Sequence, residues 1–305
     1  MGRLADIGAR ATGRLVKVAE VRGTPAGQVM ELPGRGSTFV VDTGPPPSPG
    51  VRQPPPLLLL HALACTGLLT WYPAIPHLRK RFRIITFDQR WHGQGIRSPH
   101  FSLEDCADDV VAVADALGID TFIPVGYSMG SLVSQLVWRQ HPTRVAGAVF
   151  GASTTSFTSP GRDRKMLNVV TQRLITFTEG RERSVLGSAT DTNASADTDA
   201  ESWALAQFRS TSATEVAGVG AVVSRFDSTP WIAGMDVPTS VVLTAKDRLI
   251  VPARQRRLAD LLPDSTIYEV DAGHSSCVLN AEKFTPALLA ACASVSARAA
   301  LRARR

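Results

Sequence analysis

Apolar and polar positions along the chain follow two alternating patterns. Four consecutive leucines, Leu57–Leu60, form a short continuous apolar run, which is typical of a central strand buried on both faces. Segments with apolar residues at helical spacing follow such runs, and Ser102 stands where a helix N-cap is expected. Strands are predicted at 37–43, 57–60, 82–87, 121–125, 145–150, 239–244 and 265–270, and helices at 103–117, 129–140 and 284–300. This alternation predicts an α/β fold, with a mostly parallel sheet flanked by helices.

The alternation stops between residues 152 and 235. A basic amphipathic segment at 162–179 comes first, a polar stretch at 189–200 is expected to be a mobile loop, and a helical segment follows at 200–225. Because this insertion leaves the sheet after one strand and re-enters before another, it should lie over the carboxyl ends of the strands, where open α/β sheets bind ligands. The predicted division is a loosely structured lead-in at 1–36, a core at 37–151 and 236–305, and a helical cap at 152–235.

Net charge narrows the classes of function. The formal net charge is +6, and much of the excess lies near the two ends of the chain. A nucleic-acid binder would show a basic stripe interleaved with aromatic residues, and the sequence has none. Basic ends could favour weak contact with an anionic membrane surface, although solvated ends are the simpler interpretation. The longest strongly apolar run, at 57–65, is far shorter than the roughly 18 residues that span a bilayer, and no signal peptide is evident.

Cysteine usage bears on compartment and on metal binding. Cys65, Cys106, Cys277 and Cys292 form no CxxC pair and no Cys/His spacing typical of a metal site. Free thiols in a reducing compartment are the simplest interpretation. We therefore expect a cytoplasmic protein that holds no metal.

The segment Gly126-Tyr127-Ser128-Met129-Gly130 carries the strongest chemical signal. It matches the pattern G-x-S-x-G, directly after a predicted strand and directly before a predicted helix. A serine on such a sharp turn has a strained backbone, and the flanking glycines leave room for the turn. The turn lifts the hydroxyl out of the sheet and directs the N–H groups of the helix toward a developing oxyanion. Ser128 is therefore predicted to be a nucleophile.

A nucleophilic serine needs a base and a group that orients the base. Among the six histidines, His274 follows the last predicted strand, so it can reach the same sheet edge as Ser128. Asp247 directly follows another apolar strand, and the order Ser128, Asp247, His274 is the one found in α/β-hydrolases. Asp271 is a weaker rival, because at the end of its strand it should not face the imidazole ring. The sequence predicts a Ser128–His274–Asp247 triad.

From about residue 57 onward the chain resembles the α/β-hydrolase superfamily, especially its esterase, haloperoxidase-like and C–C-bond hydrolase branch. The supporting segments are 57–61 (LLLLH), 88–93 (DQRWHG), the Ser128 turn, 238–252, and Gly273-His274. By this resemblance, the backbone N–H groups of Leu63 and Met129 form the oxyanion hole. His61 then orients its loop, and His92 has a structural role beneath the site.

The chain departs from the family pattern at two positions. Ala62 stands where the family usually has glycine, and its Cβ limits positive φ, which puts the role of Leu63 in doubt. Trp91 also replaces a family glycine, and it could either line the substrate pocket or pack. Trp91 and Tyr127 are the predicted pocket residues.

These patterns predict a serine hydrolase that cleaves a carboxylic ester, thioester or lactone through an acyl-enzyme on Ser128. The expected partner is a small-molecule acyl substrate of apolar character, and no cofactor is required because the triad is self-sufficient. The same triad also serves C–C-bond hydrolases, lyases and acyltransferases, and the fold can persist in a non-catalytic binding protein. The oligomeric state is left open.

Overall fold

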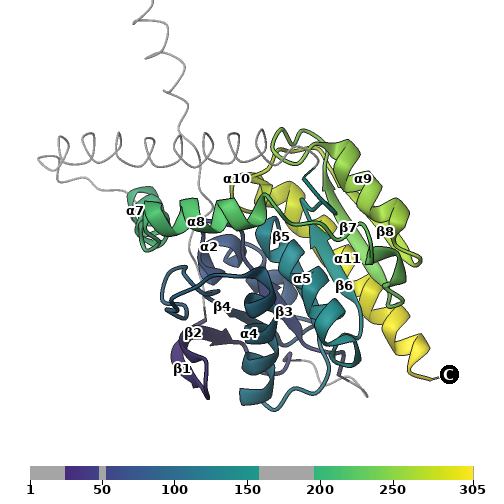
Figure 1. Cartoon of the computed structure of the whole chain (residues 1–305), viewed down its shortest axis with the longest axis horizontal. Coiled ribbons are helices and arrows are strands. Elements are labelled where there is room, and N and C mark those ends of the chain that lie inside the picture. The colour runs from purple at the N-terminus through teal and green to yellow at the C-terminus, as the bar shows by residue number, and fades with distance from the viewer. Residues whose placement is uncertain (1–24, 48–52, 158–195, 305) are drawn as a thin grey trace, which may run out of the picture.

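An eight-stranded sheet forms the centre of the computed structural model, which describes residues 25–47, 53–157 and 196–304 (Figure 1). The strands are β1 (Gln28–Leu32), β2 (Gly36–Asp42), β3 (Leu57–Leu60), β4 (Ile84–Phe87), β5 (Ile123–Tyr127), β6 (Ala148–Gly151), β7 (Thr239–Thr244) and β8 (Ser265–Val270). Their order in the sheet is β1-β2-β4-β3-β5-β6-β7-β8. β1 and β2 pair antiparallel, and β2 joins β4 antiparallel, whereas the strands from β4 to β8 are all parallel.

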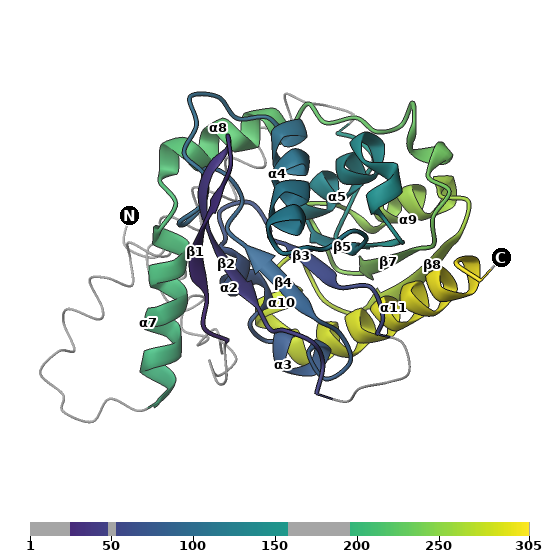
Figure 2. The same ribbon diagram turned by 90° about the horizontal axis from the view of Figure 1, so that it is seen from below.

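Helices cover both faces of the sheet, so the chain has three layers. The helices are α2 (Gly67–Trp71), α3 (Ile75–Leu78), α4 (Leu103–Ala116), α5 (Met129–Gln140), α7 (Ala196–Arg209), α8 (Ala213–Val223), α9 (Pro252–Leu261), α10 (Ser276–Leu279) and α11 (Ala281–Arg302). In Figure 2, α4, α5 and α9 lie on one side of the strands, and α3 and α11 lie on the other. This arrangement confirms the predicted α/β fold with a mostly parallel sheet flanked by helices.

Strand β3 explains why two cores form. Its four leucines are fully buried, and they alternate between the two faces of the sheet. Leu58 and Leu60 join one apolar cluster with residues of α4 and α5, while Leu57 and Leu59 join the other with residues of α3 and α11. A central parallel strand between two helical layers must be apolar on both faces, which is the pattern that the sequence carries.

Most predicted elements are observed, with shifts of a few residues at their ends. The Met129–Gln140 helix, the Leu57–Leu60 strand and the Ser102 N-cap of α4 are as predicted. The prediction of a loosely structured lead-in up to residue 36 is wrong for Gln28–Leu32, which forms the edge strand β1. Four of these five side chains are not fully buried, so the segment lacks the strong apolar run that marks the inner strands.

Within the predicted cap, the structure describes residues 152–157 and the part from helix α7 onward. The polar stretch 189–200 was expected to be a mobile loop, and this is wrong for its last residues, because α7 begins at Ala196. The predicted helical segment at 200–225 is observed as two helices, α7 and α8. The predicted basic amphipathic segment at 162–179 lies outside the described residues.

Helix α8 is fixed over the core by contacts at its N-terminal end. Ser212 and Glu215 form a capping box, in which each side chain hydrogen-bonds the backbone N–H of the other. Glu215 also pairs with Arg97 from the loop after β4. The N–H of Gly93 in that loop donates to the Thr211 hydroxyl at 3.1 Å. The cap is therefore tied to the loop that follows β4.

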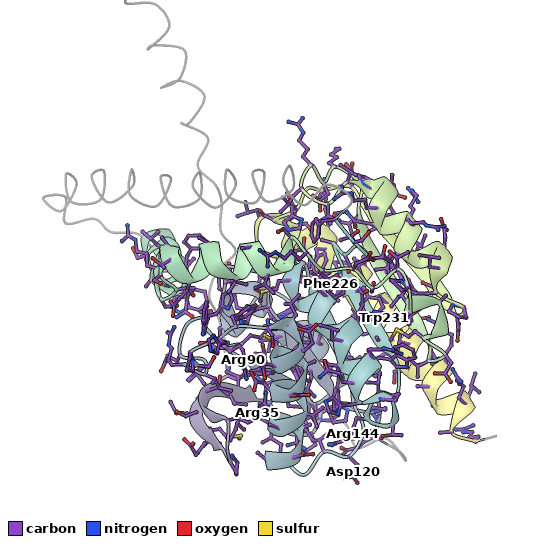
Figure 3. All side chains as sticks on the ribbon, in the orientation of Figure 1. Arg35, Arg90, Asp120, Arg144, Phe226 and Trp231 are labelled. Carbon is purple, nitrogen blue, oxygen red and sulfur yellow. The ribbon has the colours of Figure 1, made fainter. Side chains whose placement is uncertain are left out.

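A buried ion cluster holds the β1–β2 hairpin and the loop after β4 onto α4. Figure 3 labels its two arginines, Arg35 and Arg90. The Asp109 carboxylate on α4 is 1% exposed and accepts from Arg35 Nε at 2.5 Å and from Arg90 Nε at 2.6 Å. Arg90 Nη2 donates to the same carboxylate at 2.8 Å. One buried carboxylate thus joins three separate elements, and its removal would leave Arg90 buried with less compensation.

Helix α11 alone, among the described helices, has the length and apolar composition of a membrane span. Its apolar residues pack inside the protein, because Phe284, Leu288 and Val295 are at most 1% exposed and belong to the core beneath the sheet. The helix therefore fits the role of a core helix in an α/β layer.

We predict that Asp109→Ala lowers the free energy of unfolding by about 3 kcal/mol, because it leaves a buried guanidinium without its main partner. Chemical denaturation monitored by circular dichroism measures this change. Asp120→Ala serves as the control, since Asp120 is exposed and its side chain makes no contact of this kind, and should change stability by less than about 0.5 kcal/mol. Equal stability of the two variants would contradict the role given to the ion cluster.

Candidate active site

Ser128 lies on a sharp turn between β5 and α5. Its backbone has φ 52° and ψ −117°, a conformation that residues other than glycine seldom adopt. Two glycines make the turn possible. A Cβ on Gly126 would lie 2.2 Å from the carbonyl oxygen of Gly130, and a Cβ on Gly130 would lie 2.1 Å from the carbonyl oxygen of Leu60. A side chain at Gly126 would push the start of α5 away from β5, and one at Gly130 would push it away from the end of β3, so the sequence pattern G-x-S-x-G is a packing requirement here.

The Ser128 hydroxyl is part of a hydrogen-bonded row of three side chains. It donates to Nε2 of His274 at 2.9 Å, and Nδ1–H of His274 donates to Oδ2 of Asp247 at 2.7 Å. An ionised carboxylate only accepts, so Nδ1 must carry the proton and Nε2 is free to accept from the serine. The structure therefore brings together the three residues of the predicted triad, in the tautomer that a general base requires.

Burial differs along this row. The Asp247 side chain is fully buried, that of His274 is 21% exposed, and Ser128 is 9% exposed. Burial alone would raise the pKa of Asp247. The hydrogen bond from His274 and its charge, with the Ile250 N–H and the Thr244 hydroxyl, outweigh this effect and hold the pKa below its ordinary value. Asp247 is therefore ionised at neutral pH and can stabilise a protonated imidazole.

Asp271, the weaker rival for the third position, points away from the site. It is exposed and pairs with Lys246 at 2.8 Å and with Lys283 at 3.7 Å. Lys246 donates to the Asp271 carboxylate, which lowers the pKa of that carboxyl. The geometry thus favours Asp247 as the partner of His274.

Leu63 and Met129 border the same pocket as Ser128. Met129 is the first residue of α5, where backbone N–H groups have no helical partner and the helix dipole is positive. Neither the Leu63 nor the Met129 N–H donates to another group in the described part of the chain. The left-handed residue of the Leu63 loop is Ala64, with φ 63°, and not Ala62. The alanine in place of a family glycine therefore causes no strain at position 62.

His61 and His92 lie beneath the site and link the loops after β3 and β4. Nδ1–H of His61 donates to the Ala62 carbonyl at 2.8 Å, and its Nε2 accepts from the N–H of Gln89 at 2.8 Å. The two imidazole rings meet edge to face, with centroids 4.9 Å apart. Burial lowers the pKa of His92 to about 4 and holds the pKa of His61 well below its ordinary value. Both rings are therefore neutral, and His61 orients a loop and is not a second base.

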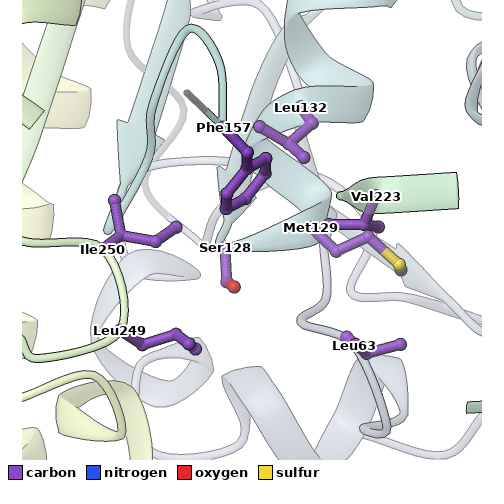
Figure 4. Close-up of a pocket in the computed structure, with 8 residues that line it drawn as sticks. All are labelled: Leu63, Ser128, Met129, Leu132, Phe157, Val223, Leu249 and Ile250. Carbon is purple, nitrogen blue, oxygen red and sulfur yellow. The ribbon is translucent and has the colours of Figure 1, made fainter. Parts of the chain in front are cut away.

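Figure 4 shows the pocket into which Ser128 opens. Apart from Ser128 the lining is apolar, and it consists of Leu63, Met129, Leu132, Phe157, Val223, Leu249 and Ile250. Sequence reasoning missed the last four of these residues and Leu132. Leu249 and Ile250 could have been found from their place just after Asp247, and Leu132 from its place one turn into α5. Phe157 and Val223 belong to the two ends of the insertion and gave no such signal.

Tyr127 was predicted to line the pocket, and this is wrong. Its side chain is 1% exposed and lies in the core beneath the sheet, because successive residues of β5 point to opposite faces. The Tyr127 hydroxyl donates to the carbonyl oxygen of His274 at 2.7 Å and is 3.1 Å from Oγ of Ser276. Tyr127 thus connects strand β5, which precedes Ser128, to the loop that carries His274.

Of the two roles predicted for Trp91, lining the pocket or packing, packing is the one observed, and Trp91 is not among the described residues that border the pocket around Ser128. Its φ is 64°, which explains why a glycine suits this position. The indole Nε1–H donates to the Ser98 carbonyl at 2.9 Å, and the ring contacts Phe101 with centroids 5.5 Å apart. The same ring lies against Gly218 of α8, so Trp91 supports the cap.

No cluster of three or more metal-ligating side chains occurs in the part of the chain that the structure describes.

The two buried imidazoles predict a pH dependence of stability. An unfolded histidine titrates near about 6.5, whereas His92 and His61 stay neutral in the fold, so the unfolded state binds more protons below that pH. The contribution of these neutral imidazoles to stability is fully present above about pH 6.5 and falls as the pH decreases, for His92 down to its folded-state pKa of about 4. From about pH 7.5 to about 5.5, each imidazole should cost about 1 kcal/mol of unfolding free energy.

Urea unfolding at the two pH values measures this slope. His92→Gln should reduce the slope, and His77→Gln should leave it unchanged, because His77 is exposed. A slope that is the same in wild type and His92→Gln would contradict the burial argument.

Comparison with known proteins gives a consistent result. The sequence model of the alpha/beta hydrolase fold family matches residues 55–281. A putative carbamate hydrolase RutD of Caulobacter vibrioides is 34% identical over 95 residues, a match that covers 30% of this chain and 35% of that protein. The pimeloyl acyl-carrier-protein methyl ester esterase of Edwardsiella ictaluri is 28% identical over 241 residues, covering 76% of this chain and 91% of its own length. The first relative is thus matched over about a third of its length.

Among solved structures, a thermophilic esterase from Thermogutta terrifontis superimposes with a TM-score of 0.68 at 20% identity, covering 89% of this chain and 99% of the esterase. The enol-lactonase from Burkholderia xenovorans LB400 gives a TM-score of 0.65 at 21% identity, covering 87% of this chain and all of that one (100%). These likenesses show the fold.

Proposed function

We propose that this chain, which belongs to the alpha/beta hydrolase fold family, is a serine hydrolase that cleaves a carboxylic ester or a related acyl bond through an acyl-enzyme on Ser128. One observation carries the proposal. The Ser128 hydroxyl, the His274 imidazole and the Asp247 carboxylate are joined by hydrogen bonds of 2.9 and 2.7 Å, at the mouth of an apolar pocket. A serine hydroxyl hydrogen-bonded to an oriented neutral imidazole is the arrangement that nucleophilic catalysis needs.

The proposed reaction has two halves. Nε2 of His274 takes the proton of Ser128 as Oγ attacks the acyl carbonyl, and Asp247 stabilises the imidazolium that forms. The N–H groups of Met129 and Leu63 donate to the tetrahedral oxyanion, which is supported by their place beside Ser128 and by their lack of another acceptor. The leaving group receives the proton from His274, and water then repeats the sequence on the acyl-enzyme.

The pocket lining supports a neutral, apolar acyl group as substrate. Every described residue around Ser128 that borders the pocket is apolar, so none of them offers a charge to a substrate carboxylate or phosphate. Two relatives are named as a putative carbamate hydrolase and a methyl ester esterase, and a similar structure as an enol-lactonase, names that are compatible with this class of substrate. A carboxylesterase is the simplest member of this class.

The proposed location is the cytoplasm. All four cysteines are free, and three of them are buried. Burial raises the pKa of the Cys65 thiol to about 11, and the pKa values of Cys277 and Cys292 are raised as well, so these thiols are protonated and unreactive at neutral pH. Unpaired thiols are the rule in a reducing compartment.

We predict that wild type hydrolyses p-nitrophenyl esters and that Ser128→Ala lowers kcat/KM by about 10⁴-fold or more, because the nucleophile is lost. Ser134→Ala is the matched control, since Ser134 is a buried serine on α5 whose hydroxyl donates only to the Gly130 carbonyl, at 2.9 Å. A series of acyl chain lengths also measures the size of the pocket.

Two outcomes would overturn parts of the proposal. Residual activity of more than a few per cent in Ser128→Ala would exclude Ser128 as the nucleophile. A folded wild type that turns over no ester of any length would contradict ester hydrolysis, and it would favour cleavage of a C–C bond or acyl transfer by the same three residues.

A further inference from the structure

The Asp247 carboxylate is held by more groups than a triad requires. Oδ1 accepts from the N–H groups of Leu249 and Ile250 at 2.8 and 2.9 Å. Oδ2 accepts from His274 and also from the Thr244 hydroxyl, at 2.8 Å. Thr244 is the last residue of β7 and is fully buried. The hydroxyl therefore approaches the same carboxylate oxygen that orients the imidazole.

A second buried side chain, Gln255 in the first turn of α9, fixes the direction of this hydroxyl. Its Oε1 accepts from the Thr244 N–H at 3.0 Å, and its Nε2 donates to the Ile250 carbonyl at 2.6 Å. These two backbone groups can bond to the amide in only one orientation, so the assignment of its oxygen and nitrogen is determined. Gln255 is 0% exposed, so these protein groups and not bulk solvent surround its amide.

The orientation of the amide then determines the next bond. Nε2 of Gln255 lies 2.9 Å from Oγ1 of Thr244 and can only donate to it. Two acceptors lie within reach of the single Thr244 hydroxyl proton, Asp247 Oδ2 at 2.8 Å and Gln255 Oε1 at 3.3 Å. Because Oε1 is more distant and already accepts from the Thr244 N–H, the proton goes to the nearer, ionised carboxylate. Gln255 thus donates to the Thr244 hydroxyl, and this hydroxyl donates to Asp247 Oδ2, which also accepts from Nδ1–H of His274.

We propose that Thr244 and Gln255 are positioning residues that hold the Asp247 carboxylate in the plane and charge state in which it orients His274. This inference rests on the proposed function of the same site. Without the Thr244 donor, two backbone N–H groups would still hold Oδ1, but the bond from His274 would be the only one shorter than 3 Å to Oδ2, so the carboxylate could turn about Oδ1 together with the ring. The ring would then be less well aligned with Ser128 Oγ, and the reaction would slow while substrate binding stayed the same.

The test compares three threonine variants. Thr244→Val keeps the size of the side chain and removes the hydroxyl, and Thr244→Ser restores it. Thr239→Val is the matched control, because Thr239 is a buried threonine at the other end of β7 whose hydroxyl donates to the Asp264 carbonyl at 2.8 Å. We expect Thr244→Val to lower kcat about tenfold with KM unchanged, and Thr244→Ser and Thr239→Val to stay within about twofold of wild type.

A second readout is independent of turnover. The proton between His274 Nδ1 and Asp247 gives a far-downfield NMR resonance, which ¹⁵N-labelled histidine assigns and which His274→Ala should abolish. This resonance should move in Thr244→Val and return in Thr244→Ser. Gln255→Met, which has a similar length but no hydrogen-bonding amide and adds no charge, should move it too, because the Thr244 hydroxyl loses the donor that directs its proton toward Asp247.

The outcomes separate the two proposals. If Ser128→Ala retains turnover, the proposed function is wrong. The NMR shifts would still test whether Gln255 and Thr244 position the Asp247 carboxylate. If Thr244→Val melts at a lower temperature but keeps the wild-type kcat and resonance position, Thr244 only satisfies buried polar groups, and the inference is wrong.

Discussion

The close approach of the β5–α5 turn to the end of β3 is the constraint on which the site depends. Gly126 and Gly130 leave no room for a Cβ, and the strained backbone of Ser128 is held because β5 is hydrogen-bonded to β3 on one side and β6 on the other. The Ser128 N–H itself donates to the Gly151 carbonyl at 2.9 Å. A parallel sheet buried on both faces is rigid enough to hold such a turn, and the surrounding packing offsets the unfavourable free energy of the strained Ser128 backbone.

Because the strands from β4 to β8 are parallel, their carboxyl ends bring the remaining groups to the same edge. β3 ends at the Leu63 loop, β7 ends at Thr244 just before Asp247, and β8 ends just before His274. Buried hydrogen bonds fix these loops to the sheet and to each other, as His61 does for the first and Tyr127 for the last. Catalytic side chains on short loops above a rigid sheet need little reorganisation during a reaction, which is the physical basis of preorganised catalysis.

The sequence was sufficient for the fold class, since strands such as Leu57–Leu60 are continuous apolar runs. It was also sufficient for Ser128, Asp247 and His274, because each of them follows a predicted strand. It was not sufficient where the signal depends on contacts distant in the chain. The edge strand β1 has mostly exposed side chains and shows no such run. Tyr127 directly precedes Ser128 in the chain, yet its side chain points to the other face of the sheet, because successive strand residues alternate between the two faces.

The sequence was also not sufficient for the pocket lining or for Thr244 and Gln255, which contact Asp247, because these contacts join distant parts of the chain. Phe157 and Val223 border the pocket from the two ends of the insertion, 66 residues apart in sequence number, and Gln255 reaches Asp247 and Thr244 from a separate helix. Local patterns predict which element a residue belongs to, but the partners of a buried polar side chain are decided by tertiary packing. The carboxylate of Asp247 was predictable, and its supporting hydroxyl and amide were not.

The most direct test of a nucleophilic Ser128 is covalent labelling with a fluorophosphonate, followed by proteolysis and mass spectrometry. A serine activated by His274 should form one adduct per chain, located on Ser128, and heat-unfolded protein should form none. An unlabelled folded protein, or an adduct on a different serine, would contradict the serine mechanism.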